Sequence, residues 1–186
     1  MSEKIITESI KKHSNVLKSI DKNSILNASE AIIKTIRNGK KIFWCGNGGS
    51  ASQANHLSAE LVGGMYQKKI KPFQSICLNV DTAFITAWSN DDSFDNIFVR
   101  QLEALGNNDD VVMLLSTSGN SQNIINAIKH AKSKEMKFIS LTGNDGGKAK
   151  KLGGININVN TDDTQRIQEM HILIGHIICD LVEKSL

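Results

Sequence analysis

The sequence lacks the features that mark a disordered, fibrous or disulfide-bonded protein. Its 186 residues include a single proline, Pro72, and 14 glycines that form no repeat, which argues against a disordered or fibrous chain. Its three cysteines, Cys45, Cys77 and Cys179, lie in apolar runs without CxxC spacing. An odd and scattered set of this kind indicates buried, reduced thiols in a cytoplasmic protein rather than a disulfide framework.

Long apolar runs and dense positive charge are also absent. No apolar stretch approaches the ~20 residues that span a bilayer, and the polar amphipathic start of the chain is not a signal peptide. The net charge is +3 and the pI about 8.7, values compatible with anionic metabolites. The longest basic cluster, at 68–71, indicates a solvated loop rather than a nucleic-acid surface. We therefore expect neither a membrane nor a nucleic acid as partner.

What is present is the composition of an ordinary globular protein. Hydrophobic residues make up 40% of the chain and charged residues 22%, and the length suits one domain covering 1–186. Amphipathic patterns predict two leading helices, at 2–20 and 24–38, as an N-terminal helical segment of about 2–38. Because one small sheet need not cover both, these helices are candidates for packing against another subunit.

After the two helices, strands and helices alternate. Strands are expected at 41–45, 73–78, 111–115, 137–141 and 154–159. Helices are expected at 50–63, about 81–89, about 94–105, 121–134, 147–152 and about 162–184. Segment 111–115 is apolar without alternation, as in a parallel strand buried on both faces. This order predicts an α/β fold with a five-stranded parallel sheet sandwiched by helices, whose ligands bind at the carboxyl ends of the strands.

The stretch 42–60 reads as a strand, a glycine turn and a helix. In the turn at 46–50, backbone N–H groups can converge on an anion or a sugar hydroxyl. His56 and Glu60 stand four residues apart and therefore share one helix face. An imidazole and a carboxylate there suit a metal pair or an acid/base pair. The stretch alone does not distinguish these sites from a tight turn with a surface His–Glu pair.

A second loop, at 116–121, carries four hydroxyl side chains just before a helix. Hydroxyls, freed backbone amides and a helix N-terminus suit a phosphate without a lysine. The alternative is an ordinary turn with Asn120 or Ser121 as N-cap, but the position opposite the glycine turn favours phosphate. Neither a Walker A loop nor a GxGxxG motif is present, so a nucleotide cofactor is unsupported.

Two further polar groups have open roles. The carboxylates of loop 89–92 could hold sugar hydroxyls or cap the helix expected at 94. The last helix carries several polar residues on a surface that is apolar on nearly all sides from 170 to 178, which indicates a buried helix and a candidate to lie between subunits. On that helix Gln168 lies about 80° from His176, and His171 about 140° from His176. One site can therefore take Gln168 with one of the histidines, and the spacing does not choose which.

Taken together, these motifs resemble the phosphoheptose isomerases, which are sugar-isomerase (SIS) domain enzymes. The resemblance covers nearly the whole chain and rests on Cys45-Gly-Asn-Gly-Gly-Ser50, His56-xxx-Glu60, Asn90-Asp91, Ser116-Thr-Ser-Gly-Asn-Ser121, Leu141-Thr-Gly-Asn-Asp-Gly-Gly147 and Arg166-Ile-Gln-Glu-Met-His171. It implies a flavodoxin-like SIS domain, a homotetramer with sites between subunits, and one Zn²⁺ per subunit.

The resemblance also implies a role for each matching residue, and it selects His176 over His171. Expected zinc ligands are His56, Glu60, Gln168 and His176, and Glu60 and His176 match the acid/base pair. Expected substrate contacts are Asn47, Gly48, Gly49, Asn90, Asp91 and Gln168, with Ser116, Thr117, Ser118 and Ser121 as the phosphate cradle. Ser52-Gln53 and Trp88-Ser89 depart from the pattern, and a tryptophan near the sugar could alter the pocket volume.

The function implied is a ketose–aldose isomerase acting through an enediol. It would convert sedoheptulose 7-phosphate to D-glycero-D-manno-heptose 7-phosphate, the first step of bacterial ADP- or GDP-heptose synthesis for lipopolysaccharide or capsule. One alternative is a non-catalytic SIS protein similar to the DnaA initiator-associating protein, whose relatives lack residues matching Glu60 and His176. Another is an isomerase of a different phosphosugar.

Overall fold

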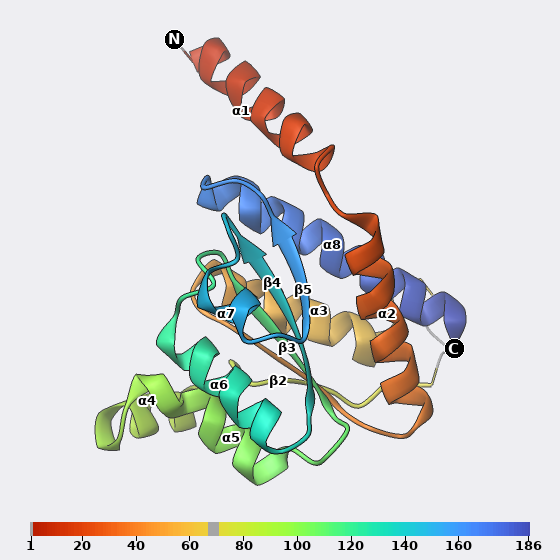
Figure 1. Ribbon diagram of the computed structural model, residues 1–186, viewed down its shortest axis with the longest axis vertical. Helices are drawn as coiled ribbons and strands as arrows, with labels where there is room; N and C mark the ends of the chain where they lie inside the picture. The colour runs from red at the N-terminus through yellow and green to blue at the C-terminus, as the bar shows by residue number, and fades with distance from the viewer. Residues whose placement is uncertain (1, 67–70) are drawn as a thin grey trace.

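A parallel sheet between two layers of helices forms the body of the protein, as the computed structural model shows for residues 2–66 and 71–186 (Figure 1). Most of the basic cluster expected to form a loop, Lys68, Lys69 and Ile70, lies outside the described residues. The strands are β1 (Ile42–Gly46), β2 (Ser75–Cys77), β3 (Val111–Ser116), β4 (Lys137–Gly143) and β5 (Ile155–Val159). All pair in parallel in the order β2-β1-β3-β4-β5, which confirms the predicted fold class.

Helices cover both faces of the sheet. They are α1 (Ser2–Leu17), α2 (Lys22–Arg37), α3 (Gly49–Gly63), α4 (Thr82–Asp91), a 3₁₀ turn η1 (Phe94–Asn96), α5 (Ile97–Leu105), α6 (Gln122–Ser133), α7 (Gly147–Lys151) and α8 (Thr164–Ser185). Successive strand residues face opposite layers. Trp44 and Met113 join the core beneath α2, α3 and α8, whereas Phe43 and Val112 join the core beneath α5 and α6. Burial on both sides explains why the strand sequences are apolar without alternation.

The strand order reverses at β1. The chain passes from β1 to β2 on one side and then returns to β3 on the other side of β1. The loops that follow the neighbouring strands β1 and β3 therefore turn away from each other. Open α/β sheets bind their ligands at such a switch point. These two loops are the glycine turn and the hydroxyl-rich loop.

Several element boundaries differ from the predictions. Only Ser75–Cys77 of the expected strand 73–78 pairs with β1. The helix expected from 94 begins as the turn η1, because the Ser93 side chain caps it by accepting from the Asp95 N–H. The expected loop 89–92 is largely helical, since α4 continues to Asp91 and the Ser89 hydroxyl donates to the Ile85 carbonyl.

The two leading helices have different surroundings. α2 packs against α8 and buries Ile25, Ala28 and Ile32, so the chain itself covers it. α1 projects away from the body (Figure 1) and buries none of its residues. Its Ile6 and Ile10 are 60% and 62% exposed. The uncovered apolar surface expected for both helices is therefore found mainly on α1, whereas on α2 Leu26 is 48% exposed.

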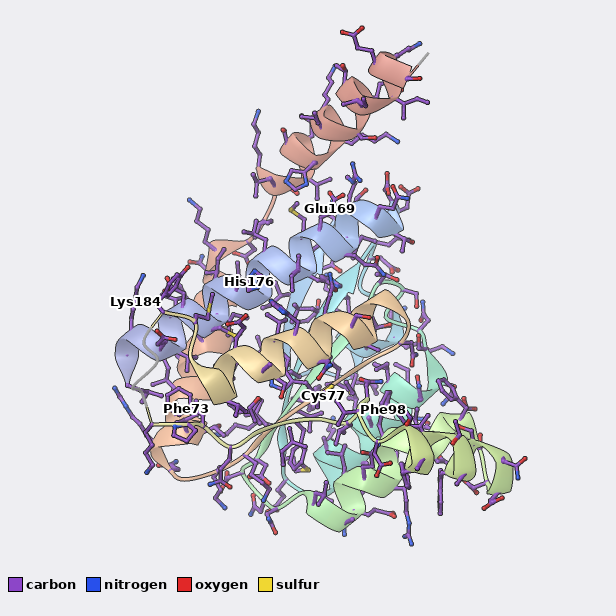
Figure 2. The ribbon with its side chains drawn as sticks, turned by 180° about the vertical axis from the view of Figure 1, so that it is seen from behind. Phe73, Cys77, Phe98, Glu169, His176 and Lys184 are labelled. Carbon is purple, nitrogen blue, oxygen red and sulfur yellow. The ribbon has the colours of Figure 1, made fainter. Side chains whose placement is uncertain are left out.

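The last helix, α8, lies beside α3 on one face of the sheet (Figures 1 and 2). Within one chain it is not covered on all sides, because Ile177 is exposed, and its burial between subunits stays a prediction. No helix in the described part of the chain is long and apolar enough to cross a membrane.

Candidate active site

Three side chains from two helices converge between α3 and α8. His56 Nε2 lies 2.8 Å from His176 Nε2 and 3.3 Å from Glu60 Oε1. The candidate ligand atoms of all three residues lie within 4.8 Å of one another. The i, i+4 spacing brings His56 and Glu60 onto one face of α3, and the packing of α8 adds His176 from 120 residues further along the chain.

This donor set fits a metal ion. Two imidazole nitrogens and one carboxylate oxygen are ligands that Zn²⁺ and related cations take in proteins. The His56 side chain is 50% exposed and that of Glu60 23%, so an ion or a substrate can reach the group within one chain. Among the described residues, no other three His, Cys, Asp or Glu side chains converge in this way.

Close approach of α3 and α8 depends on Gly175. A Cβ atom at Gly175 would lie 2.3 Å from Leu57 Cδ1, so a side chain there would force the buried Leu57 side chain to move. One turn further along, Cys179 Sγ lies 3.8 Å from the Leu57 carbonyl oxygen. Burial raises the pKa of the Cys179 thiol to about 12, which keeps it protonated near pH 7. Cys179 is therefore a packing residue of this interface.

The glycine turn lies at the start of α3. Gly48, with φ +54°, is the N-cap position, and its carbonyl accepts from the Ala51 N–H. The turn is held in place by Asn79, whose amide exchanges two hydrogen bonds with the Gly46 backbone, at 3.1 and 2.9 Å. A Cβ at Gly49 would lie 2.6 Å from Gln168 Nε2. The predicted ligand Gln168 therefore packs its side chain against this turn.

The hydroxyl-rich loop packs closely against the loop after β4. A Cβ at Gly119, where φ is +61°, would lie 2.1 Å from the Gly146 carbonyl oxygen. Within the loop the Gly119 N–H donates to Ser116 Oγ. Ser121 is the N-cap residue of α6 by position, yet its side chain makes no capping hydrogen bond; its Oγ lies 3.5 Å from Ser116 Oγ. The Ser121 hydroxyl is thus not committed to capping the helix.

A pair of side-chain amides joins the glycine turn to α6, the helix that directly follows the hydroxyl-rich loop. Asn47 Nδ2 donates to Asn123 Oδ1 at 2.9 Å, and Asn123 Nδ2 donates to Asn47 Oδ1 at 2.8 Å. Asn123 lies in the first turn of α6 and is buried. The glycine turn and the hydroxyl-rich loop therefore form one connected surface at the switch point. Both polar atoms of the Asn47 side chain, a predicted substrate contact, are bonded to Asn123.

Asn90 and Asp91 are not brought to this surface within the chain. Both are exposed at the end of α4, and the Asn90 amide donates to the Asp91 carboxylate. α4 packs against η1 and α5, on the face of the sheet opposite α3 and α8. Trp88 of α4 stacks on Phe84 and lies under the Arg100 guanidinium, 5.0 Å from the ring centroid. These contacts account for Trp88 as a packing residue of the α4–α5 surface.

Comparison with known proteins identifies the family. Residues 7–143 match the SIS domain family. A phosphoheptose isomerase from Helicobacter pylori strain P12 is 47% identical over 177 residues, which cover 95% of this chain and 90% of that protein. One from Aliarcobacter butzleri is 44% identical over 188 residues, covering 100% and 99%. A solved phosphoheptose isomerase structure from Francisella tularensis matches with a TM-score of 0.94 at 34% identity, over 99% of both chains.

The chain belongs to the phosphoheptose isomerase family. This confirms the prediction of a phosphosugar isomerase with an SIS domain. A second structure of the family, the phosphoheptose isomerase from Neisseria gonorrhoeae, matches with a TM-score of 0.93 at 35% identity over 99% of this chain and 100% of that one.

Within this phosphoheptose isomerase fold, the two histidines of α8 lie in different environments. His171 is fully buried, and its Nε2 lies 3.2 Å from the Thr142 carbonyl oxygen at the end of β4. Burial lowers its pKa to about 4, so the ring is neutral near pH 7. His176 faces α3 and contacts His56 instead. Tertiary packing thus separates two residues that the helical spacing left equivalent.

Three amide side chains of the site, Gln53, Asn79 and Asn123, were not among the predicted site residues. Asn79 follows directly after β2, so its place at the carboxyl edge was a usable signal. Asn123 is a polar residue at a buried helix position, which requires a partner but does not identify it. Gln53 departs from the family pattern, but nothing in its spacing indicates a contact with α8.

Proposed function

We propose that this protein interconverts sedoheptulose 7-phosphate and D-glycero-D-manno-heptose 7-phosphate through an enediol. The observation that carries the proposal is the convergence of His56, Glu60 and His176 in a chain of the phosphoheptose isomerase family. An isomerisation of this kind moves a proton between adjacent carbons, and it needs a base on one side and a proton donor close by. A carboxylate and an imidazole from facing helices meet that need.

In this mechanism Glu60 removes the C1 proton of the open-chain ketose. His176 moves protons on the opposite side or at an oxygen, and the proton then returns at C2. His56, Glu60, Gln168 and His176 would hold one Zn²⁺ per subunit, with Gln168 supplying an amide oxygen. When bound, that ion would polarise the carbonyl and hydroxyl oxygens of the sugar and stabilise negative charge on them.

Substrate positioning falls to the two loops at the switch point. The hydroxyls of Ser116, Thr117, Ser118 and Ser121 bind the phosphate and hold the carbon chain without joining the chemistry. The turn at Asn47, Gly48 and Gly49 contacts the sugar end, beside Gln168. Asn90 and Asp91 remain proposed sugar contacts, and their exposure on α4 is consistent with a site completed between subunits.

We further propose that residues 1–186 form a single SIS domain that assembles as a cytoplasmic homotetramer. Supporting this, α1 leaves Ile5, Ile6 and Ile10 more than half exposed, and apolar surface of that kind favours association. Light scattering should then give four times the chain mass of 20.4 kDa. A monomer at micromolar concentration would contradict the proposed tetramer, and it would not contradict the proposed reaction.

The decisive experiment is an isomerase assay over several sugar phosphates, with metal analysis of the same sample. We expect turnover of sedoheptulose 7-phosphate in preference to pentose and hexose phosphates, with activity lost on chelation and restored by zinc. Preference for another sugar phosphate would favour a different phosphosugar isomerase. Absence of turnover in a zinc-loaded sample would favour a non-catalytic SIS protein.

The place of the reaction in metabolism follows from its product. A heptose 7-phosphate is the starting compound of ADP- or GDP-heptose synthesis, and we propose that this protein supplies that first step for lipopolysaccharide or capsule. Loss of heptose from the surface glycans of a deletion strain would test this assignment.

A further inference from the structure

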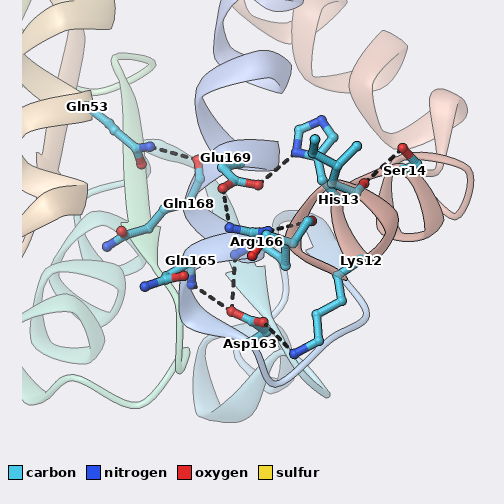
Figure 3. A network of polar contacts seen from close by, with 11 residues as sticks. Lys12, His13, Ser14, Gln53, Asp163, Gln165, Arg166, Gln168 and Glu169 are labelled. Atoms are coloured by element: carbon cyan, nitrogen blue, oxygen red, sulfur yellow. Dashed lines mark hydrogen bonds and ion pairs between the residues drawn. The ribbon is translucent and has the colours of Figure 1, made fainter. Parts of the chain in front are cut away.

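A partly buried hydrogen bond outside the proposed chemistry joins the two helices of the site. Gln53 Nε2 donates to the Gln168 carbonyl oxygen at 2.7 Å (Figure 3). Gln53 stands on α3 one turn before His56, and Gln168 stands on α8 two turns before His176. The bond therefore connects the two segments that carry the converging side chains.

The bond is not needed to form either helix. A carbonyl within α8 already accepts from the N–H four residues further on, so the Gln53 amide is an additional donor to Gln168. The other end of the same amide, Oε1, is buried and has no hydrogen-bond partner among the described residues. A buried amide oxygen without a hydrogen bond costs free energy. The orientation of Gln53 therefore makes the contact with α8 and leaves Oε1 without a partner among the described residues.

Gln168 is thereby held at two points. Its backbone carbonyl is bonded to Gln53, and its side chain lies against the bare backbone of Gly49. Both contacts come from the first two turns of α3, which the glycine turn starts. Sliding or rotation of α8 along α3 would break both contacts at once and would carry His176 away from His56.

We propose that Gln53 is a positioning residue that fixes the register of α8 against α3. It thereby keeps His56, Glu60 and His176 within reach of one cation, with Gln168 beside them. One hydrogen bond adds little to global stability, but small displacements of ligands weaken a metal site strongly. The effect on cation binding needs only the converging side chains, whereas the effect on turnover rests on the proposed function.

The test compares Gln53→Met with a matched control, Gln74→Met. Both substitutions remove an amide of similar length that donates to a backbone carbonyl. In the control the partner is Gly39, at the amino edge of the sheet and away from the site. Zinc affinity is measured by chelator competition, the ligand geometry by the visible spectrum of the Co²⁺-loaded protein, and stability by urea unfolding.

We expect Gln53→Met to weaken zinc binding about 10- to 100-fold and to alter the cobalt spectrum, while both midpoints of urea unfolding move by similar small amounts. Turnover should show a lower kcat with little change in KM, because the phosphate-binding loop is untouched. If Gln53→Met fails to fold, Gln53→Asn, whose shorter side chain falls short of the carbonyl, gives the same comparison.

Zinc affinity within twofold of the control, with an unchanged cobalt spectrum, would overturn the proposal and leave Gln53 a packing residue. Equal weakening in both variants would overturn it as well. If wild-type protein binds zinc but does not turn over sedoheptulose 7-phosphate, the proposed function fails while the metal measurements still decide the role of Gln53. A wild type that binds no zinc would overturn both.

Discussion

Two regions along α8 each place a histidine close to a carboxylate, and they differ in what surrounds the pair. At the α3–α8 interface, His56 contacts Glu60 on its own helix and His176 on the facing helix. At the α1–α8 junction, His13 Nδ1 lies 2.7 Å from Glu169 Oε2, and Glu169 also binds the Arg166 guanidinium (Figure 3).

The difference lies in the balance of donors and acceptors. At the junction, Arg166 supplies N–H donors to Glu169 and to the Ser9 carbonyl, so the carboxylate is already matched by a fixed cation. At the α3–α8 interface, the candidate ligand atoms of two imidazoles and a carboxylate lie within 4.8 Å of one another, and within residues 2–66 and 71–186 the ion-pair partner of Glu60 is His56 rather than a lysine or arginine. Ring nitrogens present lone pairs when neutral, so the chemistry of this group suits a cation. In this chain, the histidine–carboxylate group without a fixed cation is the candidate site.

The largest expected effect comes from replacing the carboxylate at the α3–α8 interface. Glu60→Gln keeps the size of the side chain but removes the carboxylate that we propose as base and as charged ligand. We expect turnover of sedoheptulose 7-phosphate to fall by at least about 100-fold, with the circular dichroism spectrum and urea midpoint little changed. Steady-state kinetics on the zinc-loaded variant give the measurement.

The matched control is Glu169→Gln at the α1–α8 junction. It makes the same chemical change on a carboxylate that binds Arg166 and His13, and it should keep most of the turnover. Near-full activity in Glu60→Gln, or equal loss in both variants, would remove the distinction between the two regions.

The second prediction separates the histidines of α8. His176→Gln should lower zinc affinity by at least about tenfold, because it removes a proposed zinc ligand, and even residues that only support a ligand affect metal affinity by that much. His171→Leu should leave zinc affinity in place but lower the free energy of unfolding by about 1–3 kcal/mol, since it removes a buried hydrogen-bond partner of Thr142. Chelator competition and urea titration measure both variants; the reverse pattern would place the metal at His171.

The third prediction concerns pH and uses His171 as a histidine without a carboxylate partner. Its pKa is lowered from the ordinary 6.5 to about 4 by burial, so the unfolded chain binds a proton that the folded chain does not. The free energy of unfolding is therefore not reduced by this histidine above pH 6.5. It falls as the pH drops from 6.5 toward 4, by about 3 kcal/mol at most. Urea unfolding at pH 7.5, 6 and 5 should show a steeper loss in wild type than in His171→Leu; parallel curves would contradict the assignment.

The smallest effect is expected from His13→Asn at the α1–α8 junction. The side chains of His13 and Glu169 are 40% and 38% exposed, so solvent screens the pair. We expect at most about 1 kcal/mol of lost stability, less at high salt, with zinc affinity unchanged. Urea unfolding at 0.05 and 0.5 M NaCl measures it. A change in zinc affinity would show that the α1–α8 junction is energetically coupled to the α3–α8 interface.

Local pattern in the sequence predicted the fold class and half of the candidate site. Strand segments such as 111–115 showed burial on both faces directly, because a strand with two apolar faces has no alternation. The i, i+4 spacing of His56 and Glu60 required them to share a face of α3. The hydroxyls of 116–121 lay after a strand, and the parallel order placed them beside the glycine turn.

Only the tertiary structure decided which residues meet across helices. The contact of His176 with His56, the burial of His171 under β4 and the bond from Gln53 to Gln168 all depend on how α8 lies on α3 and the sheet. That placement depends on the fit of Leu57 against Gly175 and on the packing of α8 against the sheet. Residue spacing within a helix fixes angles about its own axis and carries no information about the rotation and register of a second helix against it.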